Sequence, residues 1–399
     1  MLYAFILGIH PKLSLLEIAA VFKVNGIDFE LKESEKDFAV FEVEKEIEPQ
    51  DFINQLGGTI RIVKIENVGN GRDHSLPHVA QFITKNIQTE SKFSFGVSAF
   101  GLNVTNKDLI GIKKELKKVK KKPRFVPYRK KDGVLSSVQV TKNNLLKDGL
   151  EIILLKGQKS YLGKTIAVQD FENYNKRDYG RPRRNPKAGM LPPKLAQMMI
   201  NFGRGLTEND QPLLLDPFCG IGTVLQEATL LDLKSVGSDK DQAQVNSAKT
   251  NLGWFKKEFS IKETFKVIHA SIEELFKQID KNSFDLIVTE PYLGPPQERP
   301  LPEKLAQNFI SQLVPPYIKS FGKFKKLLKE KGVVVIVFPV FRLENGEEMG
   351  LDLLDELKKI GYTPIEPSKR LLNKDGKTLI YSRPNQIIKR QIIILQLSC

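Results

Sequence analysis

The most informative part of the sequence for the fold is LLLDPFCGIGT, from Leu213 to Thr223. Its three leucines are typical of a strand that is buried on both faces, and Asp216 follows them at the end of the predicted strand. A turn with Gly220 and Gly222 then opens a predicted helix. Glycines let the backbone approach a ligand closely, and ligands of open α/β sheets bind at the carboxyl ends of the strands. The stretch therefore predicts a ligand-binding turn at the edge of a sheet.

The ligand of this turn is not predicted to carry phosphates. The glycines lack the six-residue spacing of a dinucleotide fingerprint, and no Lys-Ser or Lys-Thr pair of a P-loop follows them. The next predicted strand ends in SVGSDKD and places Asp239 where a carboxylate accepts hydrogen bonds from ribose hydroxyls. Two acids at strand ends and a glycine turn describe an adenosyl site without phosphates. S-adenosylmethionine fits that description.

Strands and helices alternate after about residue 190. The stretches KSVGSD, TFKVIHA, FDLIVTEP and KGVVVIVFP read as strands, and a helix at 351–360 and a last strand at 390–397 follow. Alternation of this kind predicts a mainly parallel, doubly wound sheet. We therefore expect residues 191–399 to form a Rossmann-like α/β domain.

Two smaller α+β units are predicted before it. Residues 1–70 have the β-α-β order of a ferredoxin-like unit, and SLLE (14–17) has the spacing of a helix capping box with Ser14 as N-cap. Residues 71–172 predict a second unit, and residues 173–190, rich in Arg, Pro and Gly, predict a basic linker. The predicted strands are 2–8, 38–43, 60–68, 92–99, 137–139, 151–156 and 161–168, and the predicted helices are 14–24, 48–56, 78–87 and 106–121.

Positive charge is concentrated in one quarter of the chain. The net charge is +15, and residues 101–200 contain 24 Lys and Arg against 8 Asp and Glu, so the rest of the chain is close to neutral. Such a cluster predicts a polyanion partner, with nucleic acid first among the candidates. A solvated Lys-rich helix is the alternative explanation for GIKKELKKVKKK (111–122). A second cluster of arginines in NKRDYGRPRRNP (175–186) favours phosphate binding, because the guanidinium fork suits phosphate groups.

Length and composition exclude several other classes. The chain has 399 residues, enough for two or three domains, and its 41% hydrophobic and 27% charged residues are typical of a folded protein. The apolar runs are shorter than a membrane span, and the first residues do not resemble a signal peptide, so we expect a cytoplasmic location. Two cysteines and four unclustered histidines argue against a disulfide framework or a metal site.

A second chemical motif follows the fourth strand of the predicted Rossmann-like domain. In FDLIVTEPYLG (284–294), Glu290, Pro291 and Tyr292 come directly after the strand. A carboxylate and a proline carbonyl can accept both hydrogens of an exocyclic amine and aim its lone pair at an electrophilic methyl group, while an aromatic ring can stack on a flipped base. The alternatives are a surface carboxylate for Glu290 and a ring that packs over the sheet edge for Tyr292.

The chain resembles the THUMP-domain tRNA methyltransferases, and most of all the family that makes N2-methylguanosine at position 10 of tRNA. The resemblance rests on LSLLEIAAVF (13–22), RDYGRPRRNPKAGMLPPKLAQMMINF (177–202), DPFCGIGT (216–223) and TEPYLG (289–294), and it covers almost the whole chain. It implies a ferredoxin-like and THUMP N-terminal region that grips tRNA, and a class I methyltransferase domain. A small protein that activates the enzyme is a further candidate partner, and the sequence does not identify it.

The resemblance also implies roles for individual residues. The candidate catalytic residues are Glu290, Pro291 and Tyr292. The candidate S-adenosylmethionine-binding residues are Asp216, Pro217, Phe218, Gly220, Gly222, Thr223, Asp239 and Ser271, the last as an adenine contact. The candidate RNA-binding residues are Lys117, Lys118, Lys121, Lys122, Arg124, Arg177, Arg181, Arg183 and Arg184.

One motif departs from the family pattern. The family usually has Asp-Pro-Pro-Tyr-Gly where this chain has Glu290 to Gly294, so the acid is one methylene longer and the ring comes one residue earlier. Methylation of an adenine amine in DNA is therefore an alternative, because the same motif serves both amines. An RNA-binding protein with a degenerate methyltransferase domain is another. The net charge of +16 in residues 101–200 favours structured RNA as the substrate. The presence of all three acids, Asp216, Asp239 and Glu290, favours an enzyme.

Overall fold

The computed structural model describes residues 1–69, 74–87, 89, 91–130, 132–184, 190–262, 264–366, 371 and 378–398. The described chain forms two compact units. The first consists of Met1–Leu15 and Gly26–Phe171, and the second of Leu16–Asn25 and Glu172–Cys399. No helix in the described residues combines the length and the apolar character needed to cross a membrane.

The first unit is built on an eight-stranded sheet in the described part of the chain. In spatial order its strands are β2 (Phe29–Ser34), β3 (Phe38–Val43), β1 (Leu2–Leu7), β4 (Thr59–Gly69), β8 (Ser160–Val168), β7 (Leu150–Lys156), β5 (Lys92–Phe100) and β6 (Lys122–Phe125). Its helices are α1 (Pro11–Val24), which continues into the second unit, α2 (Pro49–Asn54), α3 (Leu76–Asn86), α4 (Asn106–Lys118) and α5 (Ser137–Lys142). The sheet passes without a break through the two ranges 1–70 and 71–172, because β4 pairs with β8.

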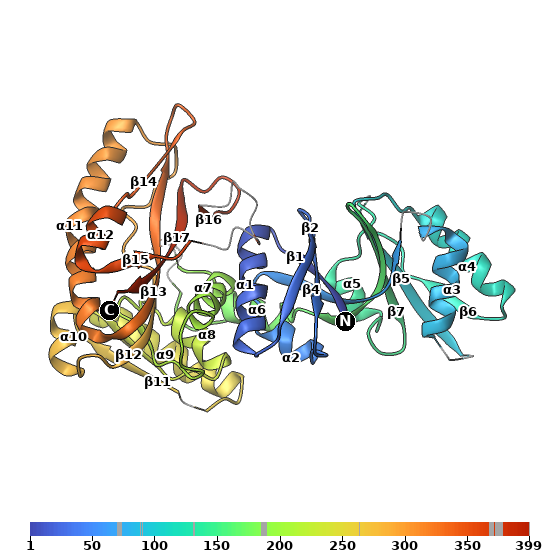
Figure 1. The fold of residues 1–399 in the computed structure, drawn as a ribbon, viewed down its shortest axis with the longest axis horizontal. Coiled ribbons are helices and arrows are strands. Elements are labelled where there is room, and N and C mark those ends of the chain that lie inside the picture. Colours follow the sequence, from blue (N-terminus) through green and yellow to red (C-terminus); the bar gives the residue numbers. More distant parts are fainter. Residues whose placement is uncertain are drawn as a thin grey trace. The chain divides into compact units, whose positions relative to one another are not determined.

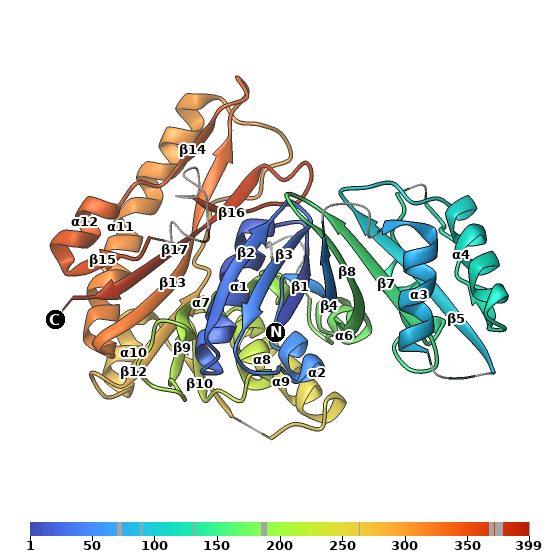
Figure 2. The same cartoon turned by 45° about the vertical axis from the view of Figure 1, so that its right-hand side comes forward.

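Helices α3 and α4 pack together on the β5 and β7 part of this sheet (Figures 1 and 2). Their apolar residues recur at helical spacing and are buried against the strands, as Leu109, Ile112 and Leu116 of α4 show. Thr105 caps α4, and the Asp108 carboxylate accepts hydrogen bonds from the Thr105 backbone N–H (2.8 Å) and hydroxyl (2.7 Å). The solvent face of α4 therefore carries the lysines of the basic helix.

Several expectations for local structure are corrected. Helix α1 begins at Pro11, so Ser14 lies inside the helix and not at its N-cap; its hydroxyl donates to the carbonyls of Gly58 (2.8 Å) and His10 (3.1 Å). The strand predicted at 137–139 is wrong, because Ser136 caps a helix there through a capping box with Gln139. Helix α6 (Phe171–Tyr179) occupies the start of the predicted linker, since the first proline of that stretch comes only at residue 182. Residues 185–189 of the junction motif lie outside the described residues.

The second unit is the predicted doubly wound sheet. In spatial order its strands are β11 (Phe265–His269), β10 (Ser235–Asp239), β9 (Leu214–Asp216), β12 (Phe284–Thr289), β13 (Leu328–Arg342), β17 (Ile388–Leu397) and β15 (Tyr362–Pro364), with β14 (Glu348–Gly350) on β13 and β16 (Leu379–Tyr381) on β17. From β11 to β13 neighbouring strands are parallel, and β17 is antiparallel to β13. The chain order reverses between β9 and β12, which marks the topological switch point where ligands bind in such sheets.

Helices cover both faces of this sheet (Figure 1). Helices α10 (Ile272–Gln278), α11 (Glu303–Leu327) and α12 (Leu354–Ile360) pack on one side, in an apolar cluster that includes Phe321, Phe324 and Leu357. Helices α7 (Pro193–Arg204) and α8 (Thr223–Leu230) contact each other on the other side, and α9 (Gln242–Glu258) contacts α8. Both faces of the central strands are therefore buried, as their continuous apolar runs predict.

Candidate active site

The turn after β9 has the backbone geometry that its glycines suggest. Gly220 and Gly222 have φ angles of +49° and +90°, in the left-handed region that other residues rarely adopt. Gly222 is the N-cap of α8, and the Gly220 backbone N–H donates to the Asp239 carboxylate at 3.0 Å. The turn after β9 is thereby held against the end of β10.

Asp216 joins β9 to β12 at the switch point. Its carboxylate accepts hydrogen bonds from the Thr289 hydroxyl (2.6 Å) and the Phe218 backbone N–H (3.2 Å), and the residue is only 2% exposed. Burial raises the pKa of Asp216 to about 7, and the charges of Asp239 and Glu290 act in the same direction, although the two hydrogen bonds oppose the shift. A cation placed beside this carboxyl group would favour its ionised form.

Asp239 is the more accessible acid. One oxygen accepts from the Gly220 backbone N–H and the other from the Asp241 backbone N–H at 2.9 Å. These two bonds fix the orientation of the carboxylate and use one acceptor position on each oxygen. Each oxygen keeps a second position, so Asp239 can still accept bonds from a pair of vicinal hydroxyls.

The other predicted donor-binding residues lie around the same strand ends. The Pro217 carbonyl accepts from the Ser238 hydroxyl (3.3 Å), and the Phe218 ring lies 6.2 Å from the Phe324 ring, between centroids. The Ser271 hydroxyl caps α10, where it donates to the Glu274 carboxylate (2.8 Å) and accepts from the Glu274 backbone N–H. Its role as an adenine contact stays a prediction.

The predicted catalytic turn follows β12 directly. Glu290 and Pro291 are largely buried, whereas the Tyr292 ring is 66% exposed and therefore does not pack over the sheet edge. The Tyr317 hydroxyl of α11 donates to the Tyr292 backbone carbonyl at 3.0 Å and holds the turn. The bond holds the backbone of Tyr292 and does not involve its side chain, whose stacking on a base stays a prediction.

Sequence reasoning did not identify the partner of Glu290. Both carboxylate oxygens accept from the Arg390 guanidinium of β17, Oε2 from Nε at 2.5 Å and Oε1 from Nη2 at 3.0 Å. The available signal is the alternation of β17, where Arg390 occupies the same face as the buried Ile392 and Ile394. A charge at a core-facing position requires a buried partner.

Asp216 and Asp239 are thus the last residues of β9 and β10, and Glu290 directly follows β12, so the three acids lie at the carboxyl ends of three neighbouring parallel strands. Residues from distant parts of the sequence meet there in the order that the switch point predicts. The arrangement provides acceptors for ribose hydroxyls, a buried carboxyl group for a cationic ligand and a carboxylate for an amine.

Cys219, within the turn after β9, is buried. A Cβ atom at Gly237 would lie 2.9 Å from the Cys219 Cβ, so the two residues are in close packing contact. Burial raises the pKa of the Cys219 thiol well above its usual value, and the charges of Asp216 and Asp239 add to the shift. A nucleophilic thiolate at this position is therefore disfavoured.

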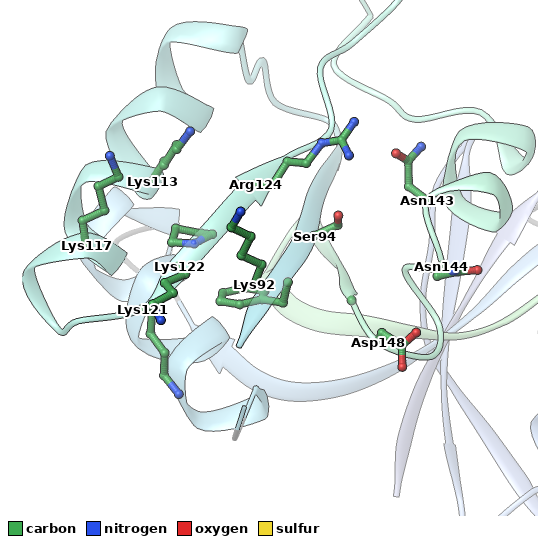
Figure 3. A pocket seen from close by; sticks show the side chains of 13 residues that line it. Lys92, Ser94, Lys113, Lys117, Lys121, Lys122, Arg124, Asn143, Asn144 and Asp148 are labelled. Carbon is green, nitrogen blue, oxygen red and sulfur yellow. The ribbon is translucent and has the colours of Figure 1, made fainter. Parts of the chain in front are cut away.

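Three of the four predicted RNA-binding lysines, together with Arg124, line a pocket in the first unit, which we name the basic pocket (Figure 3). Its lining includes Lys117 of α4, Lys121, and Lys122 and Arg124 of β6. Lys92, Ser94, Lys113, Asn143, Asn144 and Asp148 are also among its lining residues. The Lys121 ammonium group donates hydrogen bonds to the backbone carbonyls of Ile87 and Thr89, and these bonds hold it in place. Lys118 does not line the pocket and instead bonds to both oxygens of Glu115.

The four arginines of the junction differ in exposure. Arg183 and Arg184 are exposed, and Arg184 stacks on the Tyr179 ring at 4.9 Å. Arg177 and Arg181 are 6% and 3% exposed. Their guanidinium groups bond to the Glu227 carboxylate (2.9 Å) and to the Thr223 hydroxyl (2.6 Å), respectively.

The assignment of Arg177 and Arg181 to phosphate binding is therefore wrong. Arg177 of α6 and Arg181, which follows α6, both bond to side chains of helix α8, which begins directly after the turn that follows β9. The Thr223 hydroxyl, a predicted donor contact, already accepts from Arg181. Sequence composition could not separate these buried arginines from their exposed neighbours.

Family models match two ranges of this chain. A model described as RMKL-like, methyltransferase domain, matches residues 181–338, which include all three acids of the site. A model described as DNA methylase matches residues 38–250, which include Asp216 and Asp239 but not Glu290.

Curated relatives match part of the chain. A tRNA (guanine(10)-N2)-dimethyltransferase of Methanothermobacter thermautotrophicus is 34% identical over 143 residues, which are 35% of this chain and 38% of that protein. A protein of the same name from Pyrococcus abyssi is 34% identical over 167 residues, 41% of this chain and 46% of that protein. These matches span less than half of the length of either relative.

Among solved structures, TrmN from Thermus thermophilus aligns over 100% of both chains, with a TM-score of 0.53 and 14% identity. At that identity the likeness concerns the fold, and it confirms the Rossmann-like methyltransferase architecture predicted from the sequence. The two family models show that this chain belongs to the methyltransferases, and the curated relatives that it resembles over part of their length are named tRNA (guanine(10)-N2)-dimethyltransferases.

Proposed function

We propose that this protein transfers a methyl group from S-adenosylmethionine to the exocyclic N2 amine of a guanosine in tRNA, at position 10. The observation that carries the proposal is the meeting of Glu290 and Pro291 with Asp216 and Asp239 at neighbouring strand ends. The names of the curated relatives supply the substrate class and the position.

The donor would bind across the ends of β9 and β10. Asp239 accepts hydrogen bonds from the ribose hydroxyls, and the close backbone of Gly220 and Gly222 leaves room for the adenosyl group. The Asp216 carboxyl group faces the cationic part of the donor and ionises more readily when that charge is present. Pro217, Phe218, Thr223 and Ser271 complete the proposed donor pocket.

The target amine would be held by the turn after β12. The Glu290 carboxylate and the Pro291 carbonyl accept its two hydrogens, and Tyr292 stacks on the extruded base. The nitrogen lone pair then attacks the methyl carbon, the new N–C bond forms as the C–S bond breaks, and the electron pair of that bond remains on sulfur. The nitrogen afterwards loses a proton to solvent. Positioning and stabilisation of the developing positive charge supply the catalysis.

The basic pocket and the exposed Arg183 and Arg184 would bind the tRNA backbone. The lining of the basic pocket includes the positively charged side chains of Lys117, Lys122 and Arg124. A cluster of positive charge of this kind is what electrostatic binding of a phosphate backbone requires. Residues 71–172 would then act as the THUMP unit of the family. A tRNA substrate also agrees with a cytoplasmic location, and a small partner protein that activates the enzyme is compatible with this arrangement.

A methyl-transfer assay tests the proposal. The protein is incubated with labelled S-adenosylmethionine and an unmodified tRNA transcript that carries guanosine at position 10, and the digested RNA is analysed by mass spectrometry. N2-methylguanosine or N2,N2-dimethylguanosine is expected. A transcript with adenosine at position 10 is the matched control and should accept no label, whereas equal labelling of both transcripts contradicts the proposed position.

Amino methylation of adenine in DNA is the second candidate, because the DNA methylase model matches residues 38–250. The same Glu290 and Pro291 acceptors suit the N6 amine of adenine. The assay therefore includes duplex DNA. Formation of N6-methyladenine in DNA, without product in tRNA, would favour this candidate over the first.

A further inference from the structure

Arg390 reaches the proposed active site from the far side of strand β13. It belongs to β17, where it is paired in register with Pro339 of β13, and β13 separates β17 from β12. Arg390 is 5% exposed, and it lies beyond residues 181–338, the range matched by the methyltransferase domain model. The local pattern of the donor and catalytic motifs therefore does not include it.

The contact between Arg390 and Glu290 is a bidentate ion pair. Nε and Nη2 donate to different carboxylate oxygens, at 2.5 and 3.0 Å, and the two side chains are 6% and 11% exposed. Two parallel charge-assisted bonds define both the position and the plane of the carboxylate. Nη2 also donates to the Met190 carbonyl at 3.5 Å, so the guanidinium is itself held by the segment before α7.

We propose that Arg390 is a positioning residue for methyl transfer, which holds the Glu290 carboxylate in the orientation that receives the target amine. This inference rests on the proposed role of Glu290. A carboxylate has about four acceptor positions, and the guanidinium takes two of them, one on each oxygen. The remaining position on either oxygen can accept an amine hydrogen without rotation of the side chain, while the Pro291 carbonyl accepts the other.

The longer side chain of Glu290 explains why its carboxylate needs a positioning residue. Glu290 has one more rotatable bond than the aspartate that its family usually has at this position, and without a partner its carboxylate would sample more orientations. Productive methyl transfer needs the nitrogen in line with the methyl carbon, and a misplacement of about 1 Å can cost about 10²-fold in rate. Arg390 compensates for the added bond because its planar fork accepts only one alignment of the carboxylate.

The test compares Arg390→Ala and Arg390→Lys with the wild-type full-length chain, after direct measurement of S-adenosylmethionine binding to each. Lys retains the buried positive charge but offers no parallel pair of donors. We expect kcat to fall about 10²-fold in Arg390→Ala and about tenfold or more in Arg390→Lys. KM for tRNA and donor affinity should change less than about twofold. Lys389→Ala is the matched control, because its neighbouring side chain pairs with Glu348 at the surface, and it should keep the wild-type kcat.

Chemical rescue separates positioning from general structural support. Millimolar guanidinium added to Arg390→Ala should restore at least about tenfold in kcat, since it can reform the two bonds to Glu290, whereas ammonium at the same concentration should not. The double variant Glu290→Ala/Arg390→Ala should be no slower than Glu290→Ala, because Arg390 acts through Glu290.

Two outcomes overturn the inference while the wild-type protein is active: an Arg390→Lys variant with the wild-type kcat, or additive losses in the double variant. If Arg390→Ala does not fold, Arg390→Lys carries the decision, because its buried charge still compensates Glu290. Absence of methyl transfer by the wild-type protein would instead remove the proposed function, so the two failures are distinguishable.

Discussion

Among the buried arginine–glutamate pairs, Arg61–Glu151 of the first unit and Arg390–Glu290 of the second differ in how many acceptor positions of the carboxylate are occupied. In the first unit Glu151 accepts from Arg61 (2.8 Å), the Ser98 hydroxyl (2.6 Å) and the Thr165 hydroxyl (2.6 Å), and Arg61 and Glu151 are 2% and 0% exposed. In the second unit Glu290 accepts from Arg390 alone among the side chains of the described residues, at the open end of β12. A carboxylate enclosed by protein donors stabilises a core, whereas one with unused acceptors at a strand end can bind a substrate.

The largest expected effect is on catalysis at Glu290. Glu290→Ala removes the proposed amine acceptor, so methyl transfer should fall by about 10²-fold or more. S-adenosylmethionine should still bind, because the donor contacts lie on β9 and β10. Single-turnover assays and calorimetric titration with the donor measure the two quantities. Glu290→Gln is the matched control that keeps the shape and one acceptor, and unchanged turnover in Glu290→Ala would remove Glu290 from the mechanism.

Glu151 should show the opposite behaviour. Glu151→Leu leaves the Arg61 charge buried without its partner, and the free energy of unfolding should fall by about 3–5 kcal/mol. Urea denaturation of the full-length protein measures the change. The double variant Arg61→Met/Glu151→Leu should recover most of the loss, because apolar side chains of similar volume replace a buried pair without a desolvation penalty. A loss confined to kcat, with wild-type stability, would contradict the comparison.

The basic pocket should contribute to affinity but not to chemistry. Lys117→Glu/Lys122→Glu reverses two charges that line it, and tRNA binding should weaken by about tenfold or more at low salt. The slope of log affinity against log salt should decrease by about one for each phosphate group that the variant no longer binds. Lys118→Glu is the control, because Lys118 pairs with Glu115 and lies outside the lining of the pocket. Equal slopes in all three proteins would assign the lysines to a solvated face.

The smallest effect is a pH dependence of donor binding through Asp216. Because burial raises the pKa of Asp216 to about 7, this carboxyl group is mainly protonated below pH 7, and a cationic donor must displace its proton. Affinity for S-adenosylmethionine should therefore rise from pH 5.5 to 7, by up to about tenfold per pH unit, and then level off. Calorimetry in buffers of different ionisation enthalpy should detect the released proton. The Asp216→Asn variant should bind the donor with little dependence on pH in this range. If the variant keeps the pH profile of the wild-type protein, Asp216 is not the group that causes the pH dependence.

Local pattern was sufficient to predict much of the fold. The strands β1, β3, β5 and β8 and the helices α3 and α4 lie within a few residues of their predicted positions, because alternation and helical periodicity are properties of short segments. The secondary-structure prediction failed where a contact between residues far apart in the sequence determined the local structure. Ser14 has the spacing of a helix cap but bonds to Gly58, 44 positions away, since the helix begins one turn earlier.

The doubly wound sheet and the three acids at its strand ends were predictable from sequence alone. In parallel sheets with right-handed crossovers, strand-end residues meet at one edge whatever the detailed packing. Which charged side chains stay exposed depended instead on the tertiary fold. It buried Arg177 and Arg181 behind α8, left Arg183 and Arg184 exposed, and brought Arg390 to Glu290 across 100 positions of sequence. Such pairings depend on strand register and on partners far away in the sequence. The local pattern can indicate which face a charged residue takes, as it does for Arg390, but it does not identify the partner.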